Sequence, residues 1–240
     1  MKANHDMTET EYLASYDIAK YPRPSLTADV VALSIQDIPT DNYRSPMVPR
    51  MSVLLIKRGS HPFKGMWALP GGFSKQDERI EDTAARELFE ETGLRGQLLM
   101  HVDVFSEKGR DPRGWIVSSA YLAVVRKSHA KITGGDDAAE ARWFPVDEIL
   151  TGKIELAFDH LKIIKRAMER LQPVSSEDLA FSFLPPRFTM TEFQRVYEIV
   201  VNHEVVRTNF RKKMERKVTL ASGVSKVKAG HRPAALYKKA

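Results

Sequence analysis

One segment of nine residues, RELFEETGL at Arg86–Leu94, restricts the fold of this chain more than any other. Glu87, Glu90 and Glu91 stand at helical neighbour spacing, so all three carboxylates would project from one face of a helix. Like charges at this spacing destabilise an isolated helix. A divalent cation between the carboxylates would relieve the repulsion, and ligation by oxygen alone favours Mg²⁺ or Mn²⁺.

The pattern around this segment is also typical of a helix with one buried side and a defined C-terminal end. Ile80, Ala84 and Leu88 recur at every fourth position, opposite the acidic face, and would pack against the rest of the protein. Gly93 supplies the left-handed residue at which such a helix ends. We therefore expect a helix over Glu81–Thr92.

The spacing of residues before and within this helix resembles the Nudix box. Gly72 is followed after five residues by Glu78, and seven further residues lead to Arg86 and the REL-x-EE-x-GL pattern. A solvated acidic helix, which is the alternative, would require neither this glycine nor this arginine. The resemblance implies an α/β/α sandwich and a substrate in which a nucleoside diphosphate is linked to another group. Arg86 and Glu78 are expected to form a structural pair.

In Nudix hydrolases the acidic face holds the metal, and the resemblance implies the same roles here. Glu87, Glu90 and Glu91 would be the catalytic and metal-binding carboxylates, and the carbonyl of Gly72 would be a further ligand. The metal would activate a water for attack on phosphorus. One more carboxylate usually comes from the loop before the last strand. Three candidates remain open for it, namely Asp136, Asp137 and Glu140.

The segment HPFKGMWALPGGF, at His61–Phe73, resembles the branch of the family that handles ADP-ribose. Cations here could contact a phosphate, and Trp67 or Phe73 could stack on adenine. Trp67 is equally well explained as a core side chain, and His61 is better explained as a surface or structural residue than as a ligand. The predicted ligand-binding residues are Arg58, Lys64, Trp67, Gly71, Gly72, Phe73 and Arg86.

Strand patterns surround the acidic helix. Segments rich in Val, Ile and Leu and bounded by turn residues predict strands. They precede and follow the helix without strict alternation, which favours an α+β fold with a mixed sheet over a doubly wound one. The predicted strands lie at 26–35, 51–58, 97–105 and 114–125, with a short strand running into a short helix at 141–150.

The chain divides into four parts by pattern and composition. Apolar residues at helical spacing predict a longer helix over Leu156–Leu171, and a stretch with Pro, Ser and a Pro-Pro pair then marks a domain boundary. The predicted parts are an arm at 1–24, a Nudix domain at 25–152, a connecting helix and linker at 153–175, and a C-terminal domain at 176–240.

Composition excludes several kinds of chemistry and suggests one partner. The chain has no cysteine, which rules out disulfides, thiolate catalysis and cysteine-ligated zinc. No apolar run approaches membrane-spanning length and no signal-peptide pattern is present, so we expect a cytoplasmic protein without a membrane partner. Between Pro185 and Ala240 there are 13 Lys and Arg against 4 Asp and Glu. This balance favours a polyanionic partner, although a solvated basic tail would carry the same charge.

The C-terminal part begins with a clear helix start. Thr189 and Glu192 have the spacing of a capping box, and Phe188 and Phe193 have that of a hydrophobic staple. A second helix follows the turn at Asn202–Glu204. Its buried side is predicted from residues at every fourth position, namely Val206, Phe210, Met214 and Val218.

Two short helices with a tight turn, the second densely basic on its outer side, fit helix-turn-helix geometry. The remaining residues alternate, contain Gly223 and Gly230, and predict a β-hairpin that would form the wing of a winged helix. A small interaction or dimerisation domain with a basic face is the alternative. The predicted DNA-binding residues are Arg207, Thr208, Asn209, Arg211, Lys212, Lys213, Arg216, Lys226, Lys228 and Arg232.

A Nudix box joined to a C-terminal segment with FTMTEFQRVYE, RTNFRKK and GHRPAALY resembles the Nudix-related transcriptional regulators of NAD metabolism. The resemblance implies a repressor of NAD biosynthesis or salvage genes that senses ADP-ribose, binds a palindromic operator as a homodimer and leaves it when ADP-ribose binds. Many members have degenerate boxes, whereas this box is intact. An active Mg²⁺-dependent ADP-ribose pyrophosphatase, giving AMP and ribose 5-phosphate, is therefore the alternative, although we expect slow or absent hydrolysis.

Overall fold

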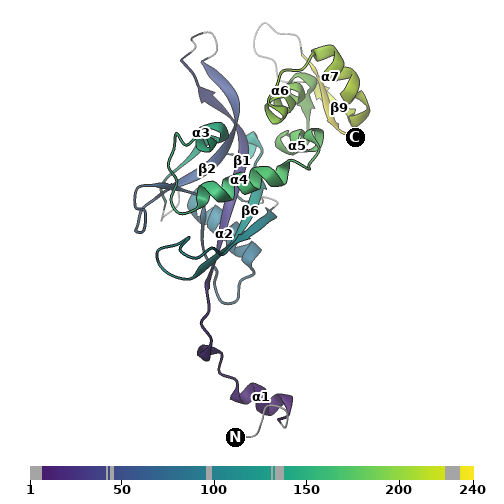
Figure 1. The fold of residues 1–240 in the computed structure, drawn as a ribbon. Coiled ribbons are helices and arrows are strands. Elements are labelled where there is room, and N and C mark those ends of the chain that lie inside the picture. The colour runs from purple at the N-terminus through teal and green to yellow at the C-terminus, as the bar shows by residue number, and fades with distance from the viewer. Residues whose placement is uncertain are drawn as a thin grey trace.

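The computed structural model describes residues 7–41, 43, 46–95, 99–130, 132, 138–224 and 233–240. Its central element is a mixed sheet of seven strands (Figure 1). The order β3-β2-β1-β6-β5 forms the main path, while β4 pairs with β1 and β7 pairs with β2. The strands are β1 Ser25–Pro39, β2 Met47–Arg58, β3 Trp67–Ala68, β4 Gly71–Phe73, β5 Leu99–Phe105, β6 Ile116–Val124 and β7 Ala138–Pro145.

The sheet is mixed, as predicted, because β1 runs parallel to β6 and antiparallel to β2. Its central strand β1 is buried continuously from Thr27 to Ile35. Continuous burial of this kind requires a cover on both faces of the sheet, whereas a strand with one solvated face would alternate. Helices provide that cover.

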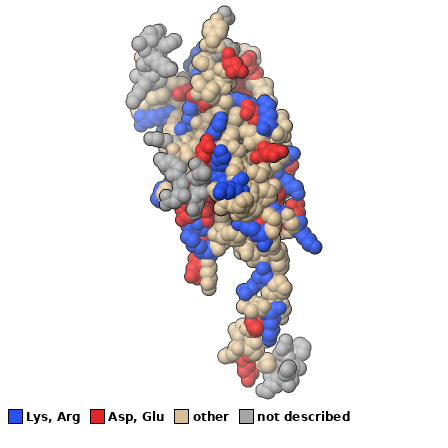
Figure 2. Space-filling view, turned by 90° about the vertical axis from the view of Figure 1, so that its left-hand side faces the viewer, with Lys and Arg blue, Asp and Glu red and all other residues tan. Residues whose placement is uncertain are grey.

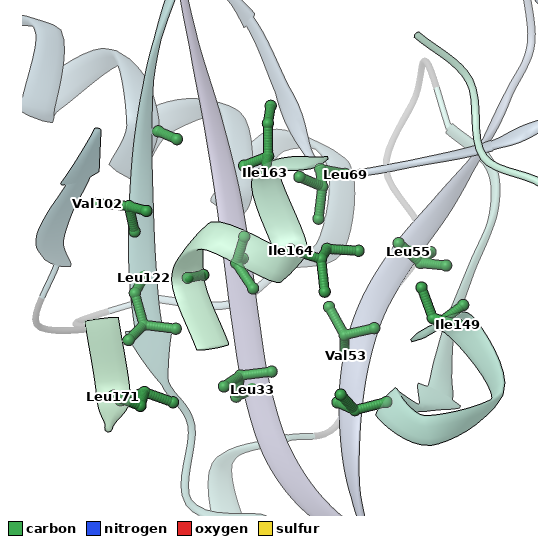
Figure 3. Packing of buried hydrophobic residues seen from close by; sticks show 14 of the residues in the cluster. Leu33, Val53, Leu55, Leu69, Val102, Leu122, Ile149, Ile163, Ile164 and Leu171 are labelled. Atoms are coloured by element: carbon green, nitrogen blue, oxygen red, sulfur yellow. The ribbon is translucent and has the colours of Figure 1, made fainter. Parts of the chain in front are cut away.

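One face of the sheet is covered by α2, at Ile80–Thr92, and the other by α3, at Val146–Leu150, together with α4, at His160–Leu171. Ala84 and Leu88 of α2 pack with one set of strand residues. Figure 3 shows the other side, where Ile163 and Ile164 of α4 lie against Leu33, Val53 and Leu55. The predicted α/β/α sandwich is confirmed. The helix α2 ends at Gly93, which has a φ of 74°, as predicted.

The start of α4 differs from the prediction. The sequence predicts a helix from Leu156, whereas α4 begins at His160. Leu156 instead forms a bridge with Trp67, and the Ala157 amide donates to the Trp67 carbonyl at 2.8 Å. Phe158 then adopts a left-handed φ of 54°, which no α-helix can include. Residues 153–175 are predicted to connect two domains, yet α4 within them packs as a layer of the sandwich.

Residues before β1 extend away from the sandwich (Figure 1). They include the helix α1, at Glu9–Ser15, whose capping box is formed by Thr8 and Glu11, and a single 3₁₀ turn at Ile18–Lys20. None of the helices in the described part of the chain combines the length and apolarity needed to cross a bilayer.

The C-terminal part is a winged helix. Its elements run in the order helix, strand, helix, helix, strand, strand, and the three strands pair as β8-β10-β9. Five large side chains lie at its centre, namely Phe181, Phe188, Phe193, Phe210 and Met214. The elements are α5 Ser176–Phe183, β8 Phe188–Thr189, α6 Met190–Val201, α7 Arg207–Met214, a 3₁₀ turn at Glu215–Lys217, β9 Val218–Val224 and β10 Ala235–Lys239.

The start of α6 has the predicted capping box. The Glu192 amide donates to the Thr189 hydroxyl, and the Glu192 carboxylate accepts from the Thr189 amide at 2.7 Å. The rings of Phe188 and Phe193 lie 5.5 Å apart, as the staple requires. One of the residues predicted to form the buried side of the second helix is exposed instead. Val206 is 64% exposed, because it is the N-cap residue of α7 and precedes the first turn.

Candidate nucleotide site and DNA-binding surface

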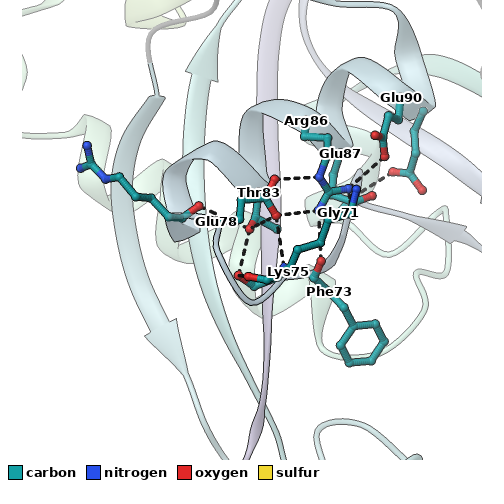
Figure 4. A network of polar contacts seen from close by, with 11 residues as sticks. Gly71, Phe73, Lys75, Glu78, Thr83, Arg86, Glu87 and Glu90 are labelled. Atoms are coloured by element: carbon teal, nitrogen blue, oxygen red, sulfur yellow. Dashed lines mark hydrogen bonds and ion pairs between the residues drawn. The ribbon is translucent and has the colours of Figure 1, made fainter.

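Arg86 lies at the centre of a polar network between α2 and the loop before it (Figure 4). Its guanidinium donates two hydrogen bonds to Glu78, at 2.8 and 2.9 Å, and one to the Phe73 carbonyl at 3.1 Å. It also contacts Glu87 at 2.6 Å and Glu90 at 2.9 Å. The pair of Arg86 with Glu78 is therefore present as predicted, and it fixes the loop against the acidic helix.

Because of the pair between Arg86 and Glu78, we expect the free energy of unfolding to depend on pH. Hydrogen bonds from Arg86 lower the pKa of Glu78 from 4.5 to about 2. A carboxyl group with a lowered pKa stabilises the folded state above its unfolded pKa, and the contribution disappears as pH falls through the folded value. We expect the stability difference between wild type and Glu78→Gln to be complete at pH 7, to shrink below about pH 4.5 and to vanish near pH 2.

Urea unfolding across this pH range measures that difference. Glu81→Gln, in the exposed first turn of α2, is the matched control and should change stability little at any pH. A Glu78 effect that persists unchanged at pH 2 would contradict the role of its charge.

A cavity of about 400 Å³ opens beside this network. Gly71, Gly72 and Phe73 of β4 form one wall, and Glu87 and Glu91 of α2 lie behind them. The remaining lining includes Thr27 and Asp29 of β1, Arg58 of β2, Lys75 and Arg86, the loop residues Arg110, Asp111 and Arg113, and Phe158 and His160 at the start of α4.

The close approach of β4 to its neighbours requires glycine at two positions. A Cβ atom on Gly71 would lie 2.3 Å from the carbonyl oxygen of Ala28, and one on Gly72 would lie 2.5 Å from the Glu87 carboxyl group. Neither distance is possible for real atoms without a shift of the neighbour. These glycines therefore allow the backbone to reach the acidic helix.

Glu91 is the most deeply buried acid of the box. Its carboxylate accepts a hydrogen bond from the Gly71 amide at 2.9 Å. Burial, together with the nearby charges of Glu87 and Asp29, raises the pKa of Glu91 to about 8, although the hydrogen bond from the Gly71 amide lowers it. Burial likewise raises the pKa of Glu87. A cation bound beside Glu87 and Glu91 would therefore stabilise the charged form of both carboxylates.

The second candidate surface is the exposed side of α7. Its apolar residues Phe210 and Met214 are buried in the winged-helix core, which turns the opposite side outward. On the side of the molecule shown in Figure 2, Lys and Arg are interspersed with Asp and Glu. The residues predicted to bind DNA on and after α7 are all exposed, namely Arg207, Thr208, Asn209, Arg211, Lys212, Lys213 and Arg216, and Glu215 and Lys217 beside them are exposed as well. Lys226, Lys228 and Arg232 lie outside the described residues.

Comparison with known protein families supports both assignments. The model of the NUDIX domain matches residues 46–167, and the model of the NrtR DNA-binding winged helix domain matches residues 180–238. The chain belongs to the NrtR family. An ADPR responsive transcriptional repressor, NtrR of Acinetobacter baylyi, is 35% identical over 236 residues, which cover 96% of this chain and 88% of that protein.

Two solved structures are similar to this NrtR-family protein. Shewanella oneidensis NrtR complexed with a 27mer DNA has a TM-score of 0.68 and 30% identity, covering 90% of this chain and 93% of that one. The NUDIX domain of Shewanella oneidensis NrtR complexed with ADP ribose has a TM-score of 0.57 and 34% identity, covering 69% of this chain and all of that one.

The acidic face of this NrtR-family protein differs from the prediction in one respect. Glu87 and Glu91 line the cavity, whereas the Glu90 side chain is half exposed and paired with Arg86. Among the described residues, no three acidic or imidazole side chains converge as a metal site. The predicted convergence of three carboxylates is thus not seen. Mg²⁺ often binds through one or two carboxylates with waters and substrate phosphates, and Glu87 with Glu91 fits that requirement.

Two predicted ligand-binding residues, Trp67 and Lys64, are not among those that line the cavity. Trp67 is a core side chain, since its ring packs 4.6 Å from that of Phe144. Lys64 and His61 are exposed residues of the loop after β2. Glu140 lies opposite Lys57, with 3.9 Å between their charged groups. The other two loop carboxylate candidates, Asp136 and Asp137, lie outside the described residues.

The rim of the cavity combines cations with aromatic rings. The predicted residues Arg58 and Phe73 both lie here. The Arg58 guanidinium lies 4.8 Å from the ring centre of Phe158, and that of Arg113 lies 4.9 Å from the ring centre of Phe73. Neither Arg113 nor Phe158 is among the predicted residues. A signal for Arg113 was present in the RDPR loop between two strands, because charged loops of this kind often carry function.

The floor of the cavity is a buried polar network that sequence patterns did not reveal. Arg110 makes two hydrogen bonds to Asp159, at 3.0 and 2.8 Å, and lies 3.6 Å from Asp29. The Leu69 amide donates to Nδ1 of His160 at 2.8 Å, which leaves the proton on Nε2, 3.7 Å from Asp29. Burial lowers the pKa of His160 and so favours the neutral ring. The carboxylates of Asp159 and Asp29 thus hold the Arg110 guanidinium at the cavity.

Proposed function

We propose that this NrtR-family protein is a transcriptional repressor that binds operator DNA through its winged helix and releases it when ADP-ribose occupies the Nudix cavity. The observation that carries the proposal is the presence, in one chain, of a cation-rimmed cavity on a Nudix sandwich and an exposed basic helix on a winged helix. Its relatives are named for the same two ligands.

The cavity suits a nucleoside diphosphate joined to a sugar. Burial and the neighbouring charge of Arg113 lower the pKa of Arg58, so an anion between the two guanidiniums would relieve both. Planar guanidiniums bind phosphate oxygens in a bidentate manner. Phe73 is 43% exposed at the rim and offers a face on which adenine can stack.

The basic helix suits double-stranded DNA. In helix-turn-helix proteins the second helix enters the major groove, and a two-fold symmetric dimer reads two half-sites about 34 Å apart. We therefore infer a homodimer on a palindromic operator. Arg207, Asn209 and Arg211 are the proposed base-edge contacts, while Lys212 and Arg216 contact phosphates. The proposed targets are NAD biosynthesis or salvage genes, and the proposed location is the cytoplasm, where such DNA lies.

Glu87 and Glu91, with the carbonyl of Gly72, are the residues that would hold Mg²⁺ or Mn²⁺ in the ligand complex. When bound, the ion would supply charge neutralisation on the diphosphate. The residues of this chain orient the ligand, with Arg58 and Arg113 at the rim and the buried Arg110 at the floor. Because Glu90 is half exposed, is bound to Arg86 and is not among the residues that line the cavity, we propose that the site favours holding ADP-ribose over hydrolysing it.

The test titrates ADP-ribose into a fluorescent operator complex and follows anisotropy. We expect saturating ADP-ribose with Mg²⁺ to weaken operator binding by about 5- to 150-fold, the usual range of allosteric coupling. AMP and ribose 5-phosphate, the two halves of the ligand, serve as matched controls and should have little effect. Unchanged DNA affinity at saturating ADP-ribose would reject the proposal.

A second candidate function, ADP-ribose pyrophosphatase, is favoured by the intact box and by the two carboxylates that line the cavity. Chromatography of AMP released with Mg²⁺ distinguishes it. Turnover that Glu91→Gln abolishes, combined with DNA affinity that ADP-ribose does not alter, would favour the enzyme over the repressor.

A further inference from the structure

The helix α4 begins inside the nucleotide cavity. Three consecutive residues at its start, Phe158, Asp159 and His160, take part in the cavity or its floor. Phe158 lines the cavity with a left-handed φ of 54°, a conformation that is strained for an aromatic residue. Asp159 is the N-cap residue of α4, yet its carboxylate makes no capping bond and binds Arg110 instead. Any ligand that moves Arg110 or Phe158 therefore acts on the start of this helix.

The other end of α4 reaches the winged helix through α5. Leu171, the last residue of α4, belongs to the same buried cluster as Leu179 and Phe183 of α5. Phe181 and Leu184, on the other side of this segment, are buried in the core of the winged helix. The sequence places a domain boundary here because of its Pro and Ser content, whereas the structure shows a helix shared by two cores.

A carboxylate on α5 contacts the proposed DNA-binding helix directly. Glu177 lies 2.7 Å from the ammonium of Lys213 on α7 and 3.9 Å from that of Lys217 just after it. Its side chain is only 12% exposed, although it carries a charge. Lys213 also donates to the Tyr197 hydroxyl of α6 at 3.3 Å. The ammonium of Lys213, a predicted DNA contact, is therefore turned towards α5 and α6.

We propose that Glu177 is a positioning residue for the DNA-binding helix, and that α4 and α5 transmit the state of the nucleotide cavity to α7 through it. The inference rests on the proposed function and adds its route of regulation. Packed helices move as rigid bodies between discrete arrangements, so a shift at the start of α4 reaches α5 without being absorbed. At α5 the ion pair between Glu177, which is 12% exposed, and Lys213, which is 57% exposed, converts the shift into a rotation of α7.

A competing route exists through α6. Ile199 and Val200 of α6 pack against the core of the sandwich, so the winged helix touches the Nudix domain there as well. This contact is apolar and involves no residue of the cavity lining. Phe158, Asp159 and His160 are not among the residues that surround Ile199 and Val200.

The test compares Glu177→Gln with wild type in the full chain. Glutamine keeps the size of the side chain and removes the charge that holds Lys213. We expect ADP-ribose affinity, measured by calorimetry with Mg²⁺, to stay unchanged. The ratio of operator Kd values with and without ADP-ribose should fall to less than about two-fold, from the 5- to 150-fold range expected of wild type. Glu169→Gln, which removes an exposed ion pair on α4, is the matched control and should keep the wild-type ratio.

The outcomes separate the two proposals. A wild-type protein whose operator affinity ignores ADP-ribose rejects the proposed function itself. A responsive wild type with an equally responsive Glu177→Gln rejects only the α4–α5 route. Loss of the response in Ile199→Ala, with the response kept in Glu177→Gln, would also overturn it in favour of α6.

A double variant tests whether Glu177 acts through Lys213. If Glu177 acts through Lys213, the Glu177→Gln/Lys213→Gln variant should show the same ADP-ribose response as Glu177→Gln alone. A full ADP-ribose response in the Lys213→Gln single variant would overturn the assignment of this pair. Amide hydrogen exchange of α7 should also change on addition of ADP-ribose in wild type and stay constant in Glu177→Gln. The opposite pattern contradicts the positioning role.

Discussion

Reversing the charge of Arg211 should abolish operator binding and leave ADP-ribose binding intact. Arg211 is exposed on α7, and within the described residues it contacts the Tyr237 hydroxyl at 3.4 Å, which is also part of the winged helix. In Arg211→Glu an anion would face the phosphates and base edges of the groove. Like-charge contacts cost several kcal/mol, so we expect operator affinity to fall by about 100-fold or more.

Anisotropy with labelled operator measures DNA binding, and calorimetry measures ADP-ribose binding. Lys165→Glu is the matched control, because it makes the same change in net charge on an exposed position of α4, far from α7 in the chain. It should weaken DNA binding only slightly. The operator affinity of wild type should also decline steeply with salt. Simultaneous loss of both ligands in Arg211→Glu would contradict the division of labour between the domains.

Removing the charge of Arg110 should give the largest loss of folding stability among single changes at the cavity. The Arg110 side chain is 4% exposed, and its guanidinium lies between the carboxylates of Asp159 and Asp29, which are also buried. In Arg110→Met both carboxylates would stay in the interior without their cation. Breaking a buried ion pair in this way destabilises a protein by about 3–5 kcal/mol. Such a loss is a large share of the stability of an ordinary domain.

Urea unfolding at pH 7 measures the effect of Arg110→Met. Arg166→Met is the matched control, since Arg166 pairs with Asp103 and Glu169 at the surface, where ion pairs contribute about 0–1 kcal/mol. We also expect Arg110→Met to bind ADP-ribose more weakly, because a cation of the cavity is lost. Equal stability of the two variants would show that the floor network does not depend on this guanidinium.

The acidic helix was accessible to prediction because its determinants are local. The spacing of Glu87, Glu90 and Glu91, the apolar side with Ala84 and Leu88, and the terminal glycine all act within a few turns of one helix. The capping box of α6 is local in the same sense. Interactions between residues three or four positions apart can be predicted from the amino-acid sequence alone.

The division of roles within the box was not accessible. Only the structure shows that Arg86 binds Glu87 and Glu90 while Glu91 accepts from the Gly71 amide. The same spacing is compatible with three converging carboxylates. The choice between the two arrangements depends on the backbone of β4, which lies outside the helix.

The sequence by itself determined the two domain types, the acidic helix and the basic helix, since helical periodicity and caps depend on neighbouring residues. The tertiary structure alone decided which distant residues complete the cavity. Parallel pairing of β1 with β6 brings Ser118 onto Asp29, and the fold then places Arg110 and His160 around the same carboxylate. These residues come from segments tens of positions apart, so no local spacing relates them, and only the packing of the sheet and α4 brings their charges together.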